Sequence, residues 1–568
     1  MINSKLSFGI VLCLIILILV MCLIILYYVF GTVNNVTETK PITTTNIDFM
    51  DSASIIKYTD YVLERSRMGY SLPESNIKMN FVCTYNVSDD NIFYKWADIY
   101  DNSLALLYFI TTNQLNSAYK LYSSLDRLFH KYGSNLLFAR YRPNGNVDYS
   151  YNGKYNDDLI GVTNVRDLGN NTYLGIAFVK YGLTYHIAGA IENSFDIIEQ
   201  IKSREIKYNN NIVGYKARSQ KNYVSMEHMI DIYALCNIML ENISLLKNIY
   251  KIGDIDNKVI ELEQMRKNCR IFANEMYNDG KYYIGTTDEK YFEVNTTSAI
   301  PADCQTWNIL SGIDSINTEH QRKSIKWCVD NCILNDTYSS NTDIYTGFRF
   351  SEDGTCIQLE NTGSGLMAFV KINNTEADID YTKIIEKIQS SIVRLCNRSP
   401  DGIVSSFRNE KLTLSEGEFN TGLTWSYWDS IHTASTIYCS LSLLYIESGG
   451  DELFNPYGTK IKAQNNQIKN VTTSQYSKIT EQLNSLFENS DTVGNLSIQC
   501  DPSNISSKLL QNYSDLYKRL ATDDGGKQGD MDVCQIVRPY ITPTNGLTEE
   551  IRFSKIITHI SNSVTPKT

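Results

Sequence analysis

Two carboxylates four residues apart stand in an otherwise apolar stretch of this chain. Glu227 and Asp231 belong to the segment MEHMIDIY, residues 226–233. In a helix, positions i and i+4 lie one turn apart on the same face, so both carboxyl groups would point the same way. Burying an unpaired charge costs several kcal/mol, so this pair predicts a polar cavity. Carboxyl groups placed in such a cavity can act as general acid and general base.

Further polar residues stand at the starts of other apolar segments. Asp101, Asp303 and Glu360 each begin one of them. Acidic residues are also favoured at helix starts as caps and by the helix dipole, so a purely structural role stays open for each. His228 is equally compatible with a structural hydrogen bond and with a contact to a ligand. The same regions hold two more polar candidates for ligand contacts, Asn171 and Thr362.

Aromatic residues flank these polar positions. Core packing accounts for many such placements, but aromatic faces also stack on the apolar faces of sugar rings. Glycoside hydrolysis requires two carboxyl groups, one protonated and one ionised. The pattern therefore predicts a carbohydrate site. The aromatic candidates for sugar contacts are Trp96, Tyr173, Trp307, Trp425 and Tyr427.

The elements that would position these residues form two interleaved sets of helices. One set is apolar over most of its length, as buried helices are: 101–112, 171–183, 226–241, 303–313, 360–372 and 429–446. The other set has one polar face: 52–67, 114–132, 186–203, 255–278, 318–334 and 377–397. Strict alternation of the two sets indicates a repeat of helical hairpins.

Short strand-like pairs follow most of the amphipathic segments, at 136–151, 281–294, 347–359 and 402–414. The dipeptides Asn144-Gly145 and Asp353-Gly354 are typical hairpin turns. Buried helices ringed by amphipathic ones, with hairpins on one side, predict an all-α fold: an (α/α)6 toroid with short β-hairpins at its mouth. An open helical solenoid is the alternative.

A long uncharged stretch, residues 8–30, precedes the repeats. As a helix it would be about 33 Å long, enough to cross a hydrocarbon core of about 30 Å. It exceeds the apolar core of a cleaved signal and lacks a small-residue cleavage site, so we expect one N-terminal transmembrane helix. The expected domains are a cytoplasmic stub (1–7), this helix, a stalk (31–50), the toroid (51–457) and a partly disordered extension (458–568).

The short flank before the anchor carries Lys5 and the terminal amine, which favours a single-pass protein with a lumenal or extracellular body, or a body on a virion surface. Sequons at positions such as Asn35, Asn170 and Asn242 allow N-glycans, although an Asn-rich chain has many sequons by chance. The 13 cysteines show no metal-ligand spacing. Cys328 and Cys332 are expected to be core thiols. We expect no metal and no cofactor.

The charge balance bears on possible partners. Lys and Arg number 52 against 63 Asp and Glu, which gives a net charge of −11. Nucleic-acid-binding proteins usually present a basic face, so no nucleic-acid partner is expected. Phosphate-binding loops and the G-x-S-x-G motif of serine hydrolases are absent from the sequence.

Six short motifs between residues 90 and 457 resemble the six-hairpin glycosidase superfamily, and more narrowly its uncharacterised secreted members. In chain order they are YDNSL (100–104), NTY (171–173), MEHMIDIY (226–233), DCQTW (303–307), ENTGSG (360–365) and GLTWSYW with NPY (422–457). Three positions depart from the family pattern: Met226, Met229 and Tyr173 replace its usual Thr, Asn and Trp.

The resemblance implies a glycoside hydrolase that acts on an oligo- or polysaccharide with inversion. It points to Glu227 and Glu360 as the acid/base carboxylates, with Asp101 or Asp303 as partner, about 6.5–9.5 Å apart. The departures favour an alternative, a catalytically inactive glycan-binding or envelope attachment glycoprotein. A polysaccharide lyase is less favoured, because the expected mouth is acidic and Arg166 is its one obvious cation.

Overall fold

The computed structural model describes residues 50–68, 79–87, 96–132, 136–142, 166–208, 211–218, 221–250, 255–288, 290, 293–316, 318–337, 343–375, 380–407, 418–423 and 426–462. The predicted transmembrane helix (8–30), the turn at Asn144-Gly145, Trp425 and the chain beyond residue 462 lie outside these ranges.

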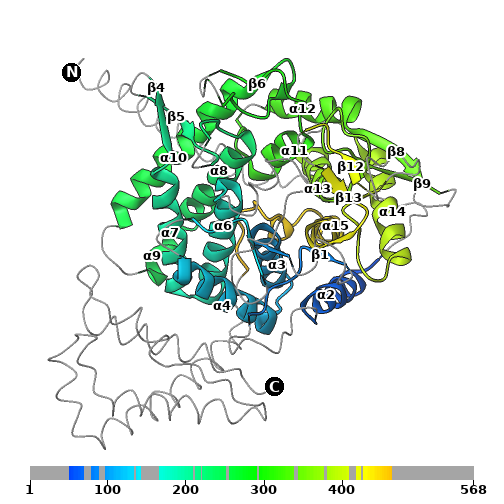
Figure 1. Cartoon of the computed structure of the whole chain (residues 1–568), viewed down its shortest axis with the longest axis horizontal. Helices are drawn as coiled ribbons and strands as arrows, with labels where there is room; N and C mark the ends of the chain where they lie inside the picture. Colours follow the sequence, from blue (N-terminus) through cyan, green and yellow to red (C-terminus); the bar gives the residue numbers. More distant parts are fainter. Residues whose placement is uncertain are drawn as a thin grey trace, which may run out of the picture. The chain divides into compact units, whose positions relative to one another are not determined.

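Within the described residues, six buried helices form a closed ring. Each packs against the next in chain order, and the last packs back against the first (Figure 1). This arrangement confirms the predicted (α/α)6 toroid over the open solenoid. The inner helices are α3 (Ile99–Thr111), α6 (Leu168–Tyr185), α8 (Met226–Glu241), α11 (Ala302–Ser311), α13 (Leu359–Thr375) and α15 (Thr433–Glu447).

Each inner helix packs against one amphipathic outer helix. The outer partner of α15, the last inner helix, is α2 near the start of the described chain, which helps to close the ring. In the order of their inner partners from α3 to α15, the outer helices are α4 (Leu115–Tyr132), α7 (Ala188–Lys202), α10 (Ile255–Met276), α12 (Thr318–Asn331), α14 (Thr382–Arg398) and α2 (Ser52–Met68). The short helices α9 (Ile243–Ile249) and η1 (Glu452–Phe454) lie outside this scheme.

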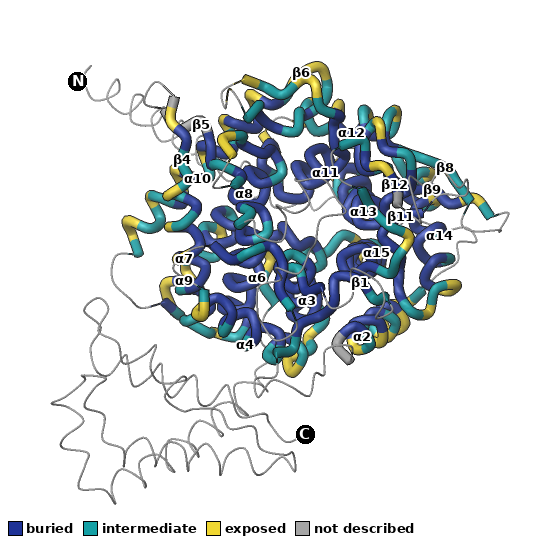
Figure 2. Tube along the Cα trace, viewed as in Figure 1, coloured by how far each residue is buried: buried dark blue, intermediate teal, exposed yellow. Residues whose placement is uncertain are grey.

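Burial follows the sequence pattern of each set. The outer helix α14 buries Ile385, Ile388 and Ile392, which recur at helical spacing on one face. The inner helices are buried on nearly all sides (Figure 2). A Cβ atom on Gly363 of α13 would lie 2.5 Å from the carbonyl carbon of Tyr438, so the glycine allows α13 and α15 to approach closely.

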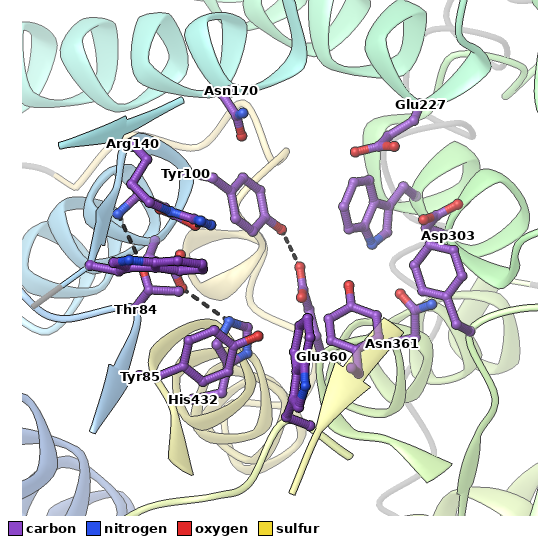
Figure 3. A pocket seen from close by; sticks show the side chains of 17 residues that line it. Thr84, Tyr85, Tyr100, Arg140, Asn170, Glu227, Asp303, Glu360, Asn361 and His432 are labelled. Carbon is purple, nitrogen blue, oxygen red and sulfur yellow. Dashed lines mark hydrogen bonds and ion pairs between the residues drawn. The ribbon is translucent and has the colours of Figure 1, made fainter. Parts of the chain in front are cut away.

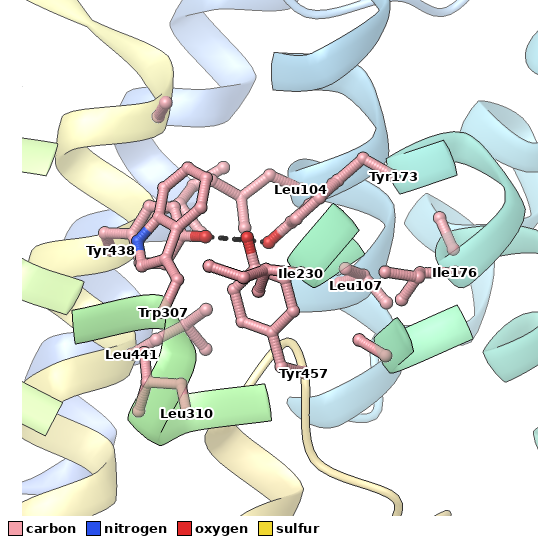
Figure 4. Packing of buried hydrophobic residues seen from close by; sticks show 14 of the residues in the cluster. Leu104, Leu107, Tyr173, Ile176, Ile230, Trp307, Leu310, Tyr438, Leu441 and Tyr457 are labelled. Atoms are coloured by element: carbon pink, nitrogen blue, oxygen red, sulfur yellow. Dashed lines mark hydrogen bonds between the residues drawn. The ribbon is translucent and has the colours of Figure 1, made fainter. Parts of the chain in front are cut away.

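Large side chains from the inner helices fill the axis of the ring (Figure 4). The Tyr173 and Tyr438 hydroxyls lie 2.8 Å apart in a hydrogen bond. Tyr457, from the NPY motif after η1, packs against Trp307 with ring centroids 5.6 Å apart. Its hydroxyl donates to Asp231 Oδ1 at 3.1 Å. The NPY segment therefore completes the core of the ring.

The strands of the described residues form two-stranded antiparallel pairs. The pairs are β1 (Tyr85–Asn86) with β14 (Ile431–His432), β2 (Ala97–Asp98) with β3 (Arg140–Tyr141), β4 (Glu205–Tyr208) with β5 (Asn211–Tyr215), β6 (Tyr277–Asn278) with β7 (Lys281–Tyr282), β8 (Ile333–Thr337) with β9 (Ile344–Phe348), β10 (Ile357–Gln358) with β11 (Ser406–Phe407), and β12 (Glu418–Asn420) with β13 (Ser426–Trp428).

One predicted local hairpin, at 347–359, is wrong, and the hairpins predicted at 136–151 and 402–414 lie partly outside the described residues. Strand β3 in 136–151 pairs with β2, which lies before α3. In 347–359, β9 pairs with β8 and β10 pairs with β11 of 402–414. The turn at Asp353-Gly354 exists, with Gly354 N donating to Ser351 O at 3.0 Å, but its flanking strands have other partners. These short strands belong to the segments that precede neighbouring inner helices, and they pair with one another across those segments. Their distance along the chain therefore does not determine which strands pair.

Other boundaries also differ from the predictions. The last inner helix begins at Thr433 and not at 429, because residues 426–428 and 431–432 are strands. Near residue 281 the hairpin turns at Asp279-Gly280, and an isolated bridge joins Thr286 to Val294. Cys328 and Cys332 are both buried, as predicted.

In the described part of the chain, no single helix is long and apolar enough to cross a membrane. Only α8 and α9 taken together, which meet at an angle of 73°, have the length and apolar composition of a membrane span among the described helices.

Candidate functional site

A cavity of about 250 Å³ lies at the end of the ring where the inner helices begin (Figure 3). This volume is slightly below the range of about 300–1,000 Å³ that is typical of pockets for drug-sized ligands, so it suits a small polar ligand. Every inner helix contributes a polar residue from its first turn or its N-cap. These residues are Asp101, Asn170, Glu227, Asp303, Glu360 and His432.

Three of these carboxylates occupy equivalent positions. Glu227, Asp303 and Glu360 are each the second residue of their helix, α8, α11 and α13. These three helices are neighbours in the ring. The repeat therefore brings three carboxyl groups to one cavity from the same position of successive helices.

The fourth residue of five inner helices holds the helix start in place. Asn171 accepts from Leu137 N at 2.7 Å and donates to Leu137 O at 2.9 Å. Asn102 and Gln305 bind the backbone of Val82 and Tyr282 with the same two-bond pattern. Hydroxyls replace the amides in the last two helices, where Phe348 N donates to Thr362 Oγ1 and Ile403 N donates to Thr436 Oγ1. We call these five side chains the backbone clamps.

Glu227 is the carboxylate most open to a ligand. Its side chain is partly exposed and makes no hydrogen bond to any described residue. Burial raises the pKa of Glu227 well above its ordinary value, and the nearby charge of Asp303 raises it further. Figure 3 shows the two carboxyl groups on the same side of the cavity. The raised pKa therefore favours the protonated form of Glu227, and its partial exposure leaves that form within reach of a ligand.

Asp303 and Glu360 are held by hydrogen bonds. Cys304 N donates to Asp303 Oδ1 at 2.5 Å, and burial raises the pKa of Asp303 to about 6. Tyr100 OH donates to Glu360 Oε1 at 2.6 Å. Burial raises the pKa of Glu360 to about 7, Tyr100 opposes this rise, and the charge of Asp303 adds to it. A hydrogen bond to the ionised form favours that form, so Tyr100 is the group that keeps Glu360 able to ionise.

Asp101 and His432 form a second polar pair in the cavity. His432 Nε2 lies 3.5 Å from Asp101 Oδ1, and Ala434 N donates to the same oxygen at 3.1 Å. Ser435 N donates to His432 Nδ1 at 3.4 Å, which leaves Nε2 as the protonated nitrogen. Burial lowers the pKa of His432 to about 3 and raises that of Asp101 well above its ordinary value, so the histidine is neutral.

Arg140 is the cation in the cavity wall. It forms a two-bond ion pair with Asp98, with Nη2 at 2.7 Å from Oδ2. Its guanidinium carbon lies 3.3 Å from the ring centroid of Trp96. Because Asp98 neutralises this charge, Arg140 is poorly placed to neutralise a uronate carboxylate, as a lyase would require.

Several residues predicted from the sequence line this cavity, and others do not. Asp101, Glu227, Asp303, Glu360, Trp96, Trp307 and Tyr427 are in its wall. Asn171 and Thr362 are backbone clamps. Asp231 lies one turn deeper and binds Tyr457, Tyr173 binds Tyr438, and His228 faces Asp167 with its Nε2 at 3.4 Å from Oδ1.

Ten lining residues were not among the predicted site residues. Most come from the strands and loops before the inner helices, where no local motif marks them. The register of β2 with β3 places Asp98 opposite Arg140, but that pairing is not visible in the sequence. The ten are Thr84, Tyr85, Asp98, Tyr100, Arg140, Asn170, Phe350, Asn361, Trp428 and His432.

Among the described residues, no group of three or more His, Cys, Asp and Glu side chains is arranged to hold a metal ion.

Comparisons with known proteins find structural neighbours. No family model matches the sequence, and no curated protein matches it. A D-mannose isomerase has a TM-score of 0.47 at 9% identity, covering 72% of this chain and 99% of its own. A family 76 glycoside hydrolase from a bovine Bacteroides thetaiotaomicron strain has a TM-score of 0.45 at 8% identity, covering 69% and 78%.

The cellobiose 2-epimerase of Bacillus thermoamylovorans has a TM-score of 0.44 at 11% identity, covering 70% of this chain and 100% of its own. At identities this low, the substrates of these neighbours do not transfer to this chain.

The clamp role of Asn171 is testable against its predicted role as a ligand contact. We expect Asn171→Ala to lower the free energy of unfolding by about 2–4 kcal/mol, because it leaves a buried N–H and a buried C=O of Leu137 unpaired. Urea denaturation measures this effect, with Asn222→Ala, an exposed side chain, as control. An unchanged stability with weaker ligand binding would contradict the clamp role.

The raised pKa of Glu360 predicts how stability depends on pH. Between pH 4.5 and about 7 the unfolded chain loses this proton while the folded protein keeps it, so the folded state loses stability as pH rises. We expect Glu360→Gln to be more stable than the wild type by about 3 kcal/mol at pH 8 and equally stable at pH 4.

Urea denaturation at the two pH values measures this difference, and Glu263→Gln, an exposed carboxyl on α10, is the control. A Glu360→Gln variant without the pH-dependent gain would show that Glu360 ionises as easily as it does in the unfolded chain.

Proposed function

We propose that this protein is a glycoside hydrolase that cleaves an oligo- or polysaccharide by acid/base catalysis with inversion. The observation that carries this proposal is the convergence of Glu227, Asp303 and Glu360 on one cavity, with pKa values raised by burial. Partly exposed aromatic side chains in the wall, Tyr427 and Trp428, offer faces for sugar rings. The resemblance of the sequence motifs to the six-hairpin superfamily supports the same assignment.

In the proposed mechanism, Glu227 is the general acid. Its protonated carboxyl group donates a proton to the glycosidic oxygen as the bond to the anomeric carbon breaks. Glu360 is the general base: it takes a proton from the water that attacks the opposite face of the anomeric carbon. Asp303 acts through its charge, which makes ionisation of Glu227 harder and so keeps the acid protonated. After cleavage Glu227 is ionised and Glu360 is protonated. Proton exchange with solvent then restores the starting state of each carboxyl group.

The alternative of an inactive glycan-binding protein rested on the departures at Met226 and Met229. Both side chains are fully buried and neither lines the cavity. Met229 is the fourth residue of α8, the position that carries a backbone clamp in the other inner helices. The departure thus alters how the start of α8 is held and leaves the carboxylates in place, so we favour the enzyme.

We also propose that residues 8–30 anchor the protein in a membrane, with the body on the lumenal or extracellular side or on a virion surface. The length and the lack of charge of this segment support the proposal. N-glycans are part of it, except at Asn242. The amide of Asn242 donates to Ile238 O at 2.9 Å and to Thr459 O at 2.8 Å, so a glycan there would break structural hydrogen bonds.

Glu227 provides the direct test of the proposal. A panel of polysaccharides assayed for released reducing sugar identifies a substrate for the wild type. On that substrate we expect Glu227→Gln to lower kcat at least about 100-fold, because the amide cannot donate the proton. The control is Glu263→Gln. Unchanged sugar release by Glu227→Gln would remove its role, and no release from any polysaccharide by the wild type would contradict the enzyme.

Tyr100 predicts a shift in the pH profile. We expect kcat/KM of the wild type to rise through about pH 7 as Glu360 ionises, and to fall at higher pH as Glu227 loses its proton. Tyr100→Phe removes the hydrogen bond that favours ionised Glu360, so the rising limb moves to higher pH while the falling limb stays. A rising limb that does not move, or that moves to lower pH, would exclude Glu360 as the base that Tyr100 supports.

A further inference from the structure

Three arginines gather where α6 begins, around a single carboxylate. Arg218 Nε lies 3.7 Å from Asp167 Oδ2. Arg204 Nη1 donates to the backbone oxygen of Arg166 at 2.9 Å, and the guanidinium of Arg166 lies 4.6 Å from the ring centroid of Phe138. We call Arg166, Arg204 and Arg218 the arginine cluster.

The described residues neutralise only part of the positive charge of the arginine cluster. Asp167 is the one carboxylate among them in an ion pair with any of the three guanidinium groups. Burial lowers the pKa of Arg204, the charge of Asp167 opposes this shift, and the like charge of Arg166 adds a smaller lowering. An excess of half-buried positive charges is unfavourable unless an anion binds among them.

Unpaired hydrogen-bond donors accompany this excess charge. Among the described residues, the buried atoms Arg166 Nη1 and Arg218 Nε make no hydrogen bond, although Arg218 Nε lies in the ion pair with Asp167. Neighbouring His228, whose side chain is only 8% exposed, has an unpartnered Nδ1. Buried polar atoms are nearly always hydrogen-bonded in folded proteins. Arg166 Nη1, which has no acceptor among the described residues, and Arg218 Nε, which has only an ion pair at 3.7 Å, therefore indicate that the cluster can receive a further acceptor.

The arginine cluster adjoins the cavity. Asn170, which lines the cavity, donates its backbone N–H to Asp167 Oδ1 at 3.2 Å. His228 follows Glu227 in α8 and also lies against Asp167. A Cβ on Gly169 would be 2.5 Å from His228 Cδ2, so this glycine allows His228 to lie against the start of α6. The arginine cluster and the cavity are thus linked through Asp167 and the start of α6.

We propose that the arginine cluster binds an anionic substituent, a carboxylate or a sulfate, on the sugar next to the one held in the cavity. This proposal rests on the proposed carbohydrate function and specifies its substrate class as an acidic glycan. Planar guanidinium groups bind carboxylate and sulfate oxygens with paired hydrogen bonds. The N-terminus of α6, an 18-residue helix, adds a favourable dipole.

Electrostatics determines which sugar carries the anion. The cavity itself holds Asp101, Glu227, Asp303 and Glu360, and an anion among them would meet like charge. Arg166, Arg204 and Arg218 are not among the residues that line this cavity. A neutral sugar ring in the cavity avoids repulsion by the carboxylates, and an acidic ring linked to it can pair with the arginine cluster.

The test is a binding measurement on full-length protein with Glu227→Gln, which prevents cleavage. The probes are two disaccharides that differ in one carboxylate, glucuronosyl-glucose and glucosyl-glucose, a sulfated glucosyl-glucose, and inorganic sulfate, titrated by calorimetry. We expect one or both anionic disaccharides to bind at least tenfold more tightly than the neutral one. Arg166→Gln and Arg218→Gln, each made separately, should remove that preference and leave the affinity for the neutral disaccharide unchanged.

Arg218→Lys should retain part of the preference, and Arg266→Gln, a partly exposed arginine of α10, should retain all of it. Equal affinity for neutral and anionic disaccharides, or a preference that survives both glutamine variants, would overturn the proposal. So would inorganic sulfate binding as tightly as the anionic sugars, because the site would then serve a free anion. Preferential binding of acidic disaccharides without cleavage by the wild type would sustain the arginine cluster and contradict the hydrolase.

Discussion

The closed ring depends on how the first turn of each inner helix is tied to the backbone segment beside it. In five of the six described inner helices the fourth residue does this through a buried amide or hydroxyl: Asn102, Asn171, Gln305, Thr362 and Thr436. These side chains satisfy backbone groups that would otherwise be buried without partners. They also fix each helix start along its axis, and the second residue is thereby fixed at the edge of the cavity.

This arrangement explains why carboxylates can gather there. Glu227, Asp303 and Glu360 repel one another and lose solvation, so their charged forms oppose folding. The clamps and the apolar core along the axis, with Trp307, Tyr438 and Tyr457, oppose that cost from positions one turn deeper. Catalytic sites commonly reduce stability in this way, because the groups needed for chemistry are not those that pack best. The repeat confines this cost to one end of the ring.

The helical repeat could be predicted from the sequence, because the period of apolar residues is a local property. Strand pairing could not, since β2 and β3, or β10 and β11, join residues more than 40 positions apart. Among site residues, the acids at helix starts were accessible to sequence reasoning. The sequence places Asn171 and Thr362 against the ligand because both stand near the starts of inner helices, as the lining residues Glu227 and Glu360 do. A side chain at the second position of an inner helix lines the cavity, whereas one at the fourth position is a backbone clamp. The two positions can be told apart only when the first residue of the helix is known. Arg140 and Tyr85 reach the cavity from strands, which no motif marked.

The most direct test of the central claim, that Glu227 and Glu360 act as acid and base across a water molecule, is the stereochemistry of the product. Proton NMR during cleavage of a substrate found in the polysaccharide panel records the anomeric form released first, before mutarotation. The account predicts a product of inverted configuration, since water attacks directly. Release of the retained anomer would contradict it, because retention requires one carboxylate to attack the sugar and form a covalent intermediate.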